Sequence, residues 1–281
     1  MVVASVVVPA HDEAASIART LRALRTGVGP DDLDVVVVCN GCRDATAEVA
    51  READPQARVI EIPTPSKREA VRVGNTVTDV FPRVHLDADI ELPGAALLEL
   101  VAAVGEHGTL AAAPRRAVPR AGCSPWVRWY YDVWEELPHV QAGLFGRGVV
   151  VLSEAGQARV EHVAGLMNDD LAMSEAFGPD ERRVVTDAVA VVHPPRTVAD
   201  LVRRRTRVAT GNAQAARLGV RRPGSQTRLR TLLGLAVARP GLAARLPVFL
   251  GVYLVASVGA RRAVRAGDFD TWHRDESSRT G

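Results

Sequence analysis

The chain has 281 residues, of which 47% are hydrophobic, and this is enough for one large globular core or for one domain with an appendage. Its formal net charge of +2 argues against a general nucleic-acid-binding protein, and its aromatic content of 4% argues against a platform that stacks bases. Lysine occurs once, as Lys67, among 35 basic residues. This arginine bias is typical of a high-GC bacterial genome and makes the single lysine a candidate functional residue.

The first 115 residues alternate apolar runs with helical patterns. Strands are predicted for residues 5–8, 34–38, 58–62, 83–86 and 109–113, and helices for residues 13–25, 44–53, 67–80 and 93–106. Strands that alternate with helices of this length indicate βαβ units and a mainly parallel sheet in an α/β fold. The continuous valine run at residues 35–38 indicates a strand that is buried on both faces.

Polar residues follow three of these predicted strands, in the segments His11-Asp12-Glu13, Asn40-Gly41 and Asp87-Ala88-Asp89. Ligands of parallel α/β sheets bind beyond the carboxyl ends of the strands, so we expect one site at this edge. Cys39 and Cys42 flank the Asn-Gly pair, and their position after a strand favours a turn over a redox pair.

Asp87 and Asp89 carry the strongest chemical signal. Residues i and i+2 of an extended segment point to the same side, so the two carboxylates are expected to converge, with Glu91 as a third candidate ligand. Oxygen ligands at a strand end suit Mg²⁺ or Mn²⁺ that also holds substrate phosphates. The sequence therefore predicts a divalent-metal site here.

The remaining elements are less regular. They are predicted as an aromatic helix or loop at 124–139, a glycine-rich turn at 143–148, a strand at 149–152, a helix at 171–176 after Asn168-Asp169-Asp170, one or two strands at 184–192 and an arginine-rich helix at 197–218. We predict one domain over residues 1–218 and a helical C-terminal extension over residues 219–281.

The uncharged run at residues 246–260 is bracketed by Arg245 and Arg261-Arg262. Its fifteen residues are too few to span a bilayer, because an ordinary transmembrane helix needs about 20. A buried helix and an interfacial helix that leans on a membrane are both compatible with this pattern.

Three motifs together resemble the family 2 glycosyltransferases. They are Val6-Val7-Val8-Pro9-Ala10-His11-Asp12-Glu13, Val37-Val38-Cys39-Asn40-Gly41-Cys42-Arg43-Asp44-Ala45-Thr46 and Leu86-Asp87-Ala88-Asp89, in this order. The resemblance covers about residues 2–215 and implies the nucleotide-sugar-binding GT-A fold with an inverting mechanism.

The resemblance also implies site residues. Nucleoside contacts fall on Pro9, Ala10, His11, Glu13, Asn40 and Asp44, while Lys67, in Ser66-Lys67-Arg68-Glu69-Ala70, lies near the diphosphate together with Asp87. Cys39 stands where the family usually has an aspartate that reads uracil, and Cys42 and Asp12 also depart from the family pattern. The base of the nucleotide is therefore left open.

Asp169-Asp170-Leu171 resembles the family's Glu-Asp-x-x-Leu motif, which makes Asp170 the expected general base and places Asp169 at the usual glutamate. The alternative is that both acidic residues interact with a helix dipole. Arg204 and Arg207 resemble diphosphate-binding residues of processive members, without the Gln and Trp of that motif. His193 resembles a loop residue that supplies an additional metal ligand in some GT-A enzymes.

We therefore expect a metal-dependent inverting enzyme that moves a sugar from a UDP-, GDP- or dTDP-sugar to an acceptor hydroxyl, with Mg²⁺ or Mn²⁺ as cofactor. The acceptor is expected in cell-envelope, polysaccharide or glycolipid synthesis, where it can be lipid-linked, and we expect no nucleic-acid partner. The N-terminus lacks the pattern of a signal peptide, so we expect a cytoplasmic protein with peripheral contact at the inner face of the plasma membrane.

Two alternatives remain open at this stage. One is a non-catalytic nucleotide-sugar-binding module, which measurable hydrolysis of a sugar nucleotide would distinguish from an enzyme. The other is a sugar nucleotidyltransferase, although residues 9–13 contain no glycine-rich loop. A Rossmann dehydrogenase is excluded, because no Gly-x-Gly-x-x-Gly follows an early strand.

Overall fold

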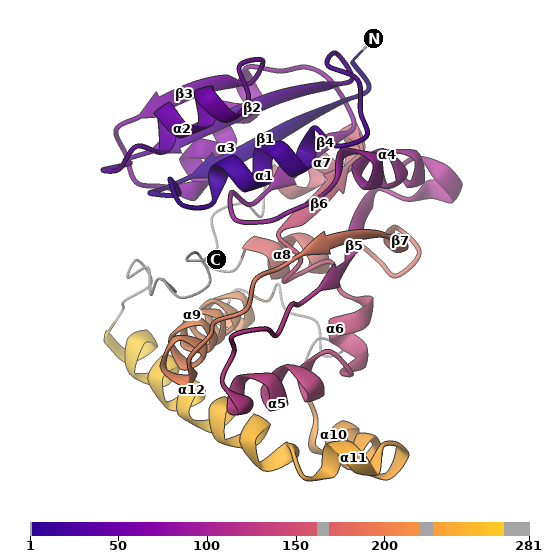
Figure 1. Ribbon diagram of the computed structural model, residues 1–281. Helices are drawn as coiled ribbons and strands as arrows, with labels where there is room; N and C mark the ends of the chain where they lie inside the picture. Colours follow the sequence, from indigo (N-terminus) through magenta and orange to yellow (C-terminus); the bar gives the residue numbers. More distant parts are fainter. Residues whose placement is uncertain (1, 162–168, 218, 220–226, 267–281) are drawn as a thin grey trace. The chain divides into compact units, whose positions relative to one another are not determined.

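The computed structural model describes residues 2–161, 169–217, 219 and 227–266 (Figure 1). The chain divides into two compact units. The first comprises Met1–Val118, Gly146–Ala164 and Phe177–His193, and the second comprises Pro119–Phe145, Gly165–Ala176 and Pro194–Gly281. Because the two units are interleaved along the sequence, the predicted boundary after residue 218 stays a prediction.

The first unit is built on a seven-stranded sheet with the order β3-β2-β1-β4-β6-β5-β7. Its strands are β1 (Ala4–Ala10), β2 (Leu33–Asn40), β3 (Arg58–Ile62), β4 (Arg83–Leu86), β5 (Ala111–Ala117), β6 (Val149–Leu152) and β7 (Arg182–Val191). β3, β2, β1 and β4 run parallel to one another, whereas β6 is antiparallel to both β4 and β5. The predicted mainly parallel α/β sheet is thus confirmed, with β6 as the reversed strand.

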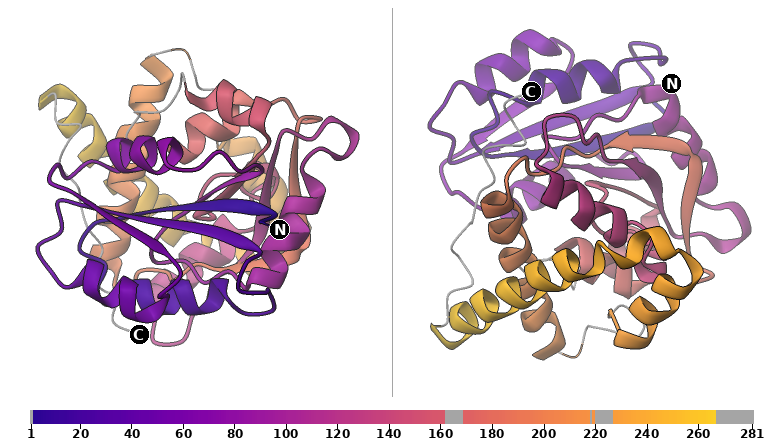
Figure 2. Two further views of the ribbon diagram at one scale, coloured as in Figure 1. Left: turned by 90° about the horizontal axis from the view of Figure 1, so that it is seen from above. Right: turned by 60° about the horizontal axis from the view of Figure 1, so that its bottom comes forward.

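Helices cover both faces of this sheet, as the two views of Figure 2 show for the early part of the chain. The helices of the first unit are α1 (Ile17–Leu24), α2 (Thr46–Ala53), α3 (Lys67–Thr76), α4 (Gly94–Ala103), the short 3-10 helix η1 (Glu106–Gly108) and α7 (Glu154–Glu161). α1, α2 and α4 contribute to one hydrophobic cluster, and α3 contributes to another on the opposite face of β2.

The valine run of β2 explains this two-sided packing. Val35 and Val37 belong to the cluster with α1, α2 and α4, whereas Val36 and Val38 belong to the cluster with α3. All four are almost fully buried, as expected when successive side chains of a strand point to opposite faces. The prediction of a strand buried on both faces is confirmed.

Several element boundaries differ from the predictions, and the local contacts of two helices show why. α1 begins at Ile17 rather than at residue 13, because residues 14–16 form a turn in which the N–H of Ser16 donates to the carbonyl of Glu13, while the N–H groups of Glu13 and Ala14 donate to Thr46 and Asp44. α3 ends at Thr76 rather than at residue 80. Beyond it, backbone carbonyls of residues 78 and 80 accept from the buried guanidinium of Arg83.

The second unit is helical in its described part. Its helices are α5 (Pro125–Trp134), α6 (Pro138–Ala142), α8 (Asp169–Ala176), α9 (Val198–Arg217), α10 (Leu229–Ala238), α11 (Pro240–Ala243) and α12 (Leu246–Ala266). α12 packs against α9 and α5. Its residues Phe249, Val252, Ala256 and Ala260 are buried and recur at helical spacing, which defines the packed face. Phe249 stacks on Tyr130 of α5 with ring centroids 5.2 Å apart.

α12 is six residues longer than the uncharged run in the sequence, because the helix continues through Arg261, Arg262 and Arg265. Its 21 residues make it long and apolar enough to cross a membrane by length and composition alone, with a mean hydropathy of 1.3 over an 18-residue window. Only 22% of that window is buried. The helix therefore combines one packed face with an exposed apolar face.

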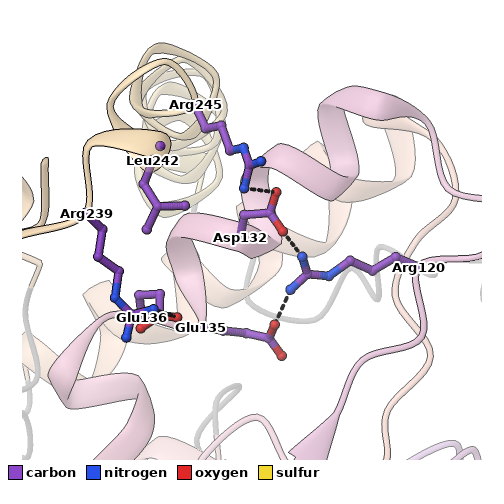
Figure 3. A pocket seen from close by; sticks show the side chains of 8 residues that line it. Arg120, Asp132, Glu135, Glu136, Arg239, Leu242 and Arg245 are labelled. Carbon is purple, nitrogen blue, oxygen red and sulfur yellow. Dashed lines mark hydrogen bonds and ion pairs between the residues drawn. The ribbon is translucent and has the colours of Figure 1, made fainter.

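A charged pocket of about 340 Å³ lies between α5 and the segment around α11 (Figure 3). Asp132 accepts from Arg120 and from Arg245, the latter at 2.7 Å, while Glu135 pairs with Arg120 and Glu136 with Arg239. Every carboxylate in the pocket is thus engaged by an arginine of the same unit. This network holds the start of α12 to α5, so we assign the pocket a structural role.

Packing of α3 against the sheet leads to a stability prediction. A Cβ on Gly74 would come within 2.3 Å of Cγ1 of Val7, which is fully buried in β1. We expect Gly74→Ala to lower the free energy of unfolding of the first unit by about 1–3 kcal/mol, as overpacked cores do. Gly234→Ala is the matched control, because it also lies within a helix but has no atom within 4 Å of its Cβ position. Urea unfolding should show an unchanged or slightly raised stability for the control.

Candidate functional site

The carboxyl ends of β2, β1 and β4 meet at one edge of the sheet. Ala10, the last residue of β1, pairs with Cys39 of β2, and Val7 pairs with His85 of β4. In this register the segments that follow the three strands, which begin at His11, Gly41 and Asp87, leave the sheet side by side. The structure thus brings the three predicted polar segments to the same edge.

Hydrogen bonds fix the loop after β1 to the turn after β2. Nδ1 of His11 lies 2.5 Å from the carbonyl oxygen of Asn40, and Nδ2 of Asn40 donates to the carbonyl oxygen of Ala10 at 2.7 Å. Oδ1 of Asp12 accepts from the backbone N–H of Arg43 at 2.6 Å. Of the predicted nucleoside-contacting residues, Pro9, Ala10 and Asn40 are buried, whereas His11 is partly exposed and is held in place by its contact with Asn40.

Glu13 and Asp44, also predicted to contact the nucleoside, are engaged within the protein. Oε2 of the buried Glu13 accepts from the hydroxyl of Ser16 at 2.6 Å, and its backbone N–H donates to Oγ1 of Thr46. Asp44 accepts from the backbone N–H of Ala14 through one oxygen and from Thr46 through the other. These two carboxylates stabilise the loops. The sequence did not identify Ser16 and Thr46 as their hydrogen-bond partners, because nothing in the spacing of these residues indicates such contacts.

Asp87 and Asp89 lie immediately after β4, but not in an extended segment. The strand ends at Leu86, and residues 88 and 89 form a turn in which the N–H of Ile90 donates to the carbonyl of Asp87. The argument from strand alternation was therefore wrong for this pair. Burial nevertheless alternates, because Ala88 and Ile90 are buried while both aspartates are partly exposed. Both carboxylates thus remain accessible to a ligand.

The glycine-rich turn before β6 contacts this segment. The backbone N–H of Asp87 donates to the carbonyl of Gly148 at 2.8 Å, and a Cβ on Gly148 would come within 2.3 Å of Ile90 and 3.3 Å of Oδ2 of Asp87. Gly148 also has a φ of +65°, which favours glycine. A larger residue at this position would therefore displace Asp87.

Lys67 reaches the same carboxylate. Its Nζ lies 2.9 Å from Oδ1 of Asp87. Lys67 is the first residue of α3, which Ser66 caps by accepting a hydrogen bond from the backbone N–H of Glu69. A cation at a helix N-terminus is unfavourable for the helix dipole, and Asp87 offsets that cost. The single lysine of the chain is thus held beside the predicted metal and diphosphate site.

Glu91 and His193, both predicted metal ligands, contact each other. Nε2 of His193 lies 2.6 Å from Oε1 of Glu91, and the same carboxylate forms an ion pair with Arg19 at 2.9 Å. Within the described residues, the predicted set of Asp87, Asp89, Glu91 and His193 does not form a cluster of three ligand atoms at metal-binding separation. Glu91 is in this structure a partner of Arg19 and His193.

The remaining predicted residues belong to the second unit. Asp170 is the second residue of α8 and is partly exposed, and Asp169 begins this helix, with its side chain outside the described part of the chain. Arg204 and Arg207 lie on α9 and are half-buried. Within the predicted aromatic segment 124–139, Tyr130 and Trp134 are packed in the core, whereas Trp126 and Trp129 are 53% and 37% exposed.

The two cysteines beside Asn40 have different environments. Cys39 is buried at the end of β2, and this burial, with smaller effects from Cys42 and Glu61, raises its pKa to about 12. Cys42 is partly exposed and accepts from the backbone N–H of Asp12 through its Sγ at 3.4 Å. The two thiols, three positions apart, are therefore expected to react differently.

A family of known proteins matches the part of the sequence that forms this edge of the sheet. A sequence model described as Glycosyl transferase family 2 matches residues 5–148, which include every residue described above for the ends of β1, β2 and β4. This match covers more than half of the chain. No curated protein sequence matches the chain significantly.

Solved structures share the fold. A mannosyltransferase from Pyrobaculum calidifontis, in complex with GDP-Man and Mn²⁺, is similar with a TM-score of 0.59 and 20% identity over 94% of this chain and 75% of that one. Glucosyl-3-phosphoglycerate synthase from Mycobacterium tuberculosis, with Mn²⁺, UDP-glucose and phosphoglyceric acid, is similar with a TM-score of 0.54 and 18% identity over 78% and 81%. S. aureus TarS, in complex with UDP, is similar with a TM-score of 0.53 and 11% identity over 99% of this chain and 95% of that one. The predicted GT-A fold is confirmed.

The contrast between Cys39 and Cys42 can be tested by alkylation. With a pKa of about 12, Cys39 has a thiolate fraction of only about 10⁻⁴ at pH 8, and its burial also blocks access. We expect iodoacetamide to modify Cys42 first in the native protein, and fragment mass spectra to place the label there. Comparable labelling of Cys39 under native conditions would contradict the described environment; both should be labelled equally in urea.

Proposed function

The chain belongs to glycosyl transferase family 2 and is a glycosyltransferase, and we propose that it is a metal-dependent, inverting enzyme that uses a nucleoside-diphospho-sugar donor. The observation that carries this proposal is the pairing of Lys67 with Asp87 at the end of β4, beside the partly exposed Asp89. An ammonium and carboxylates at the carboxyl edge of a parallel sheet suit a ligand that carries phosphates.

The donor is proposed to occupy this edge. The nucleoside is proposed to lie against the segment Pro9–His11 and the turn at Asn40, where His11 is the partly exposed side chain and hydrogen bonds between the two segments fix the backbone. Lys67 takes the diphosphate as a compact point charge. Solved structures of the same fold contain GDP-Man, UDP or UDP-glucose, which supports a nucleoside diphosphate here and leaves the base and the sugar open.

The donor atoms at this edge suit Mg²⁺ or Mn²⁺. Asp89 and Asp87 offer hard oxygen ligands, and few protein ligands are needed because such ions keep water and bind substrate phosphates. Mn²⁺ is present in two of the similar structures. When bound, the ion supplies charge neutralisation for the leaving diphosphate. Glu91 and His193 are proposed as further ligands only if they separate from each other.

Asp170 is proposed as the general base. Its carboxylate accepts the proton of the acceptor hydroxyl as that oxygen attacks C1 of the sugar, and the bond from C1 to the diphosphate breaks on the opposite face. Because the new bond forms in a single displacement on the face opposite to the breaking bond, the anomeric configuration inverts. Asp169 is proposed at the position of the family's glutamate, and Arg204 and Arg207 are proposed to contact phosphate oxygens of the donor.

The acceptor is proposed to be lipid-linked or otherwise membrane-bound, in cell-envelope, polysaccharide or glycolipid synthesis at the inner face of a bacterial plasma membrane. Residues 227–266 contain seven arginines and no acidic residue. On α12 the exposed large apolar residues are Tyr253, Leu254, Val255 and Val258, and on α10 they are Leu229, Leu233 and Val237. Apolar stripes with arginine and without acid suit an anionic membrane surface.

The metal-site proposal is tested with Asp89→Asn. We expect this variant to lose turnover and to bind the donor more weakly, because it removes a charged oxygen ligand from the proposed ion. EDTA should have the same effect on the wild-type enzyme, and added Mn²⁺ should restore it. Transfer assays should be preceded by thermal-shift screening of UDP-, GDP- and dTDP-sugars with Mn²⁺, because binding raises stability. Full activity in EDTA would contradict metal dependence.

The general-base proposal separates two adjacent aspartates. We expect Asp170→Asn to lower kcat by roughly 10²-fold or more, because a positioned base contributes about 10²–10⁴-fold, while donor binding stays near the wild-type value. Asp169→Asn should lower kcat less. The reverse order of effects would make Asp169 the base. Steady-state kinetics with donor-binding titrations decides between these outcomes.

The membrane proposal is tested with vesicles rich in phosphatidylglycerol. Leu254→Glu with Val258→Glu should abolish co-sedimentation at low salt, because both residues lie on the exposed face of α12 and would carry charge into the interface. Val2→Glu with Val3→Glu is the matched control, since these residues are 38% and 39% exposed in the first unit. Wild-type protein that stays in the supernatant at low ionic strength would contradict membrane contact.

A further inference from the structure

Three different metal-ligating side chains meet at the ends of β1 and β2. A ring nitrogen of His11, a carboxylate oxygen of Asp12 and the sulfur of Cys42 all lie within 4.8 Å of one another. All three residues are partly exposed, so a solvated ion has access to them. Among the residues that the structure describes, these three form the one group of at least three potential ligand side chains at metal-binding separation.

The surrounding hydrogen bonds prepare each ligand atom. Because the carbonyl oxygen of Asn40 can only accept, the Nδ1 of His11 donates to it, and the lone pair of the neutral ring is then on Nε2. Nε2 lies 3.8 Å from Oδ2 of Asp12. A histidine that donates its second ring N–H to a backbone carbonyl is the usual arrangement at protein metal sites.

Asp12 and Cys42 are held with similar precision. Oδ1 of Asp12 accepts from the backbone N–H of Arg43, and this leaves Oδ2 on the side of His11. Sγ of Cys42 accepts from the backbone N–H of Asp12 at 3.4 Å and donates to the carbonyl oxygen of Ala10 at 3.5 Å, and a bound cation would replace the thiol proton. Asp12 adopts a φ of +48°, which is uncommon for a residue other than glycine and which the neighbouring bonds maintain.

The donor set selects the kind of ion. One nitrogen, one oxygen and one sulfur suit a borderline-soft cation such as Zn²⁺, whereas Mg²⁺ and Mn²⁺ prefer oxygen alone. Ligand atoms around tetrahedral zinc are separated by roughly 3.3–3.8 Å, from bond lengths of about 2.0–2.3 Å. Nε2 of His11 and Oδ2 of Asp12 already have this separation at 3.8 Å, and the ligand atoms of the three residues lie within 4.8 Å of one another.

We propose that His11, Asp12 and Cys42 bind one Zn²⁺ ion, with the fourth position left to water or another small ligand, and that this ion joins the end of β1 to the end of β2. The site differs in chemistry from the oxygen-only site of Asp87 and Asp89. It goes beyond the proposed function, because its test uses neither donor nor acceptor. Where the proposed function holds, the ion shares His11 with the proposed nucleoside site, and Zn²⁺ binding affects donor affinity.

Co²⁺ replaces Zn²⁺ as a spectroscopic probe. Titration of the reduced, full-length protein with Co²⁺, in the absence of nucleotide and with a non-thiol reductant, should produce a thiolate-to-cobalt charge-transfer band in the near ultraviolet. The band should saturate at one Co²⁺ per chain and disappear when Zn²⁺ is added. Oxygen ligands at Asp87 and Asp89 give no such band, so Asp89→Asn should leave it unchanged.

Variants identify the ligands. Cys42→Ser should remove the band, and His11→Gln and Asp12→Asn should each weaken Co²⁺ binding by at least about 10-fold. Cys39→Ser and Cys123→Ser are the matched controls, since they remove the two other thiols of the chain, and both should keep the band. Circular dichroism verifies that each variant is folded, and Zn²⁺ should raise the Tm of the wild type but not that of His11→Gln.

Three results would overturn the proposal. They are the absence of the band in the wild-type protein, its persistence in folded Cys42→Ser, and its loss in both Cys39→Ser and Cys123→Ser. Because none of these measurements depends on sugar transfer, an enzyme that fails every transfer assay can still bind Co²⁺, and an active enzyme can still lack the band. The two proposals therefore fail separately.

Discussion

The parallel register that joins β2, β1 and β4 is the constraint on which the site depends. β1 pairs with β2 along its whole length from Ala4 to Ala10 and with β4 on its other side. The valines of β1 and β2 are buried on both faces of the sheet, so side-chain alternation alone does not select one register. The hydrogen bonds that join the strand ends, from Asn40 to the carbonyl of Ala10 and from His11 to the carbonyl of Asn40, fit the observed register, which places His11, Asn40 and Asp87 at one edge. The apolar core stabilises the sheet, and these polar contacts position the groups at its edge.

Much of the first unit follows from the sequence, because strands such as β1, β2 and β6 contain continuous apolar runs bounded by polar or turn residues. The predicted bounds of β3, β4 and β6 are those of the structure. The failures arise where long-range hydrogen bonds override a local pattern. Residues after Ala10 have a helical pattern, yet their N–H groups bind Thr46 and Asp44, about thirty positions away. Similarly, α7 follows β6 without a strong apolar periodicity that would predict it.

The site was predictable in location but not in its pairwise contacts. Sequence order places the predicted residues at strand ends, whereas the partner of each charge depends on side chains brought near by folding. Arg19 comes from α1 and pairs with Glu91, which no spacing in the sequence indicates. The same holds for the aromatic segment, where Tyr130 and Trp134 face the core and Arg205 lies over both rings. Composition alone cannot divide such residues between a binding surface and a core.

Lys67 is a cation in the first turn of α3, where the helix dipole favours an anion. A serine cap and a glutamate three residues later are a strong start signal for α3, and both favour an anion rather than a cation in the first turn. The chain nevertheless places its single lysine there, 2.9 Å from Asp87. Arginine, which the chain uses at every other basic position, would present a broad planar fork to the same carboxylate. A compact ammonium covers less of the Asp87 carboxylate than a guanidinium would, and the cation site proposed at the end of β4 needs that carboxylate to be accessible.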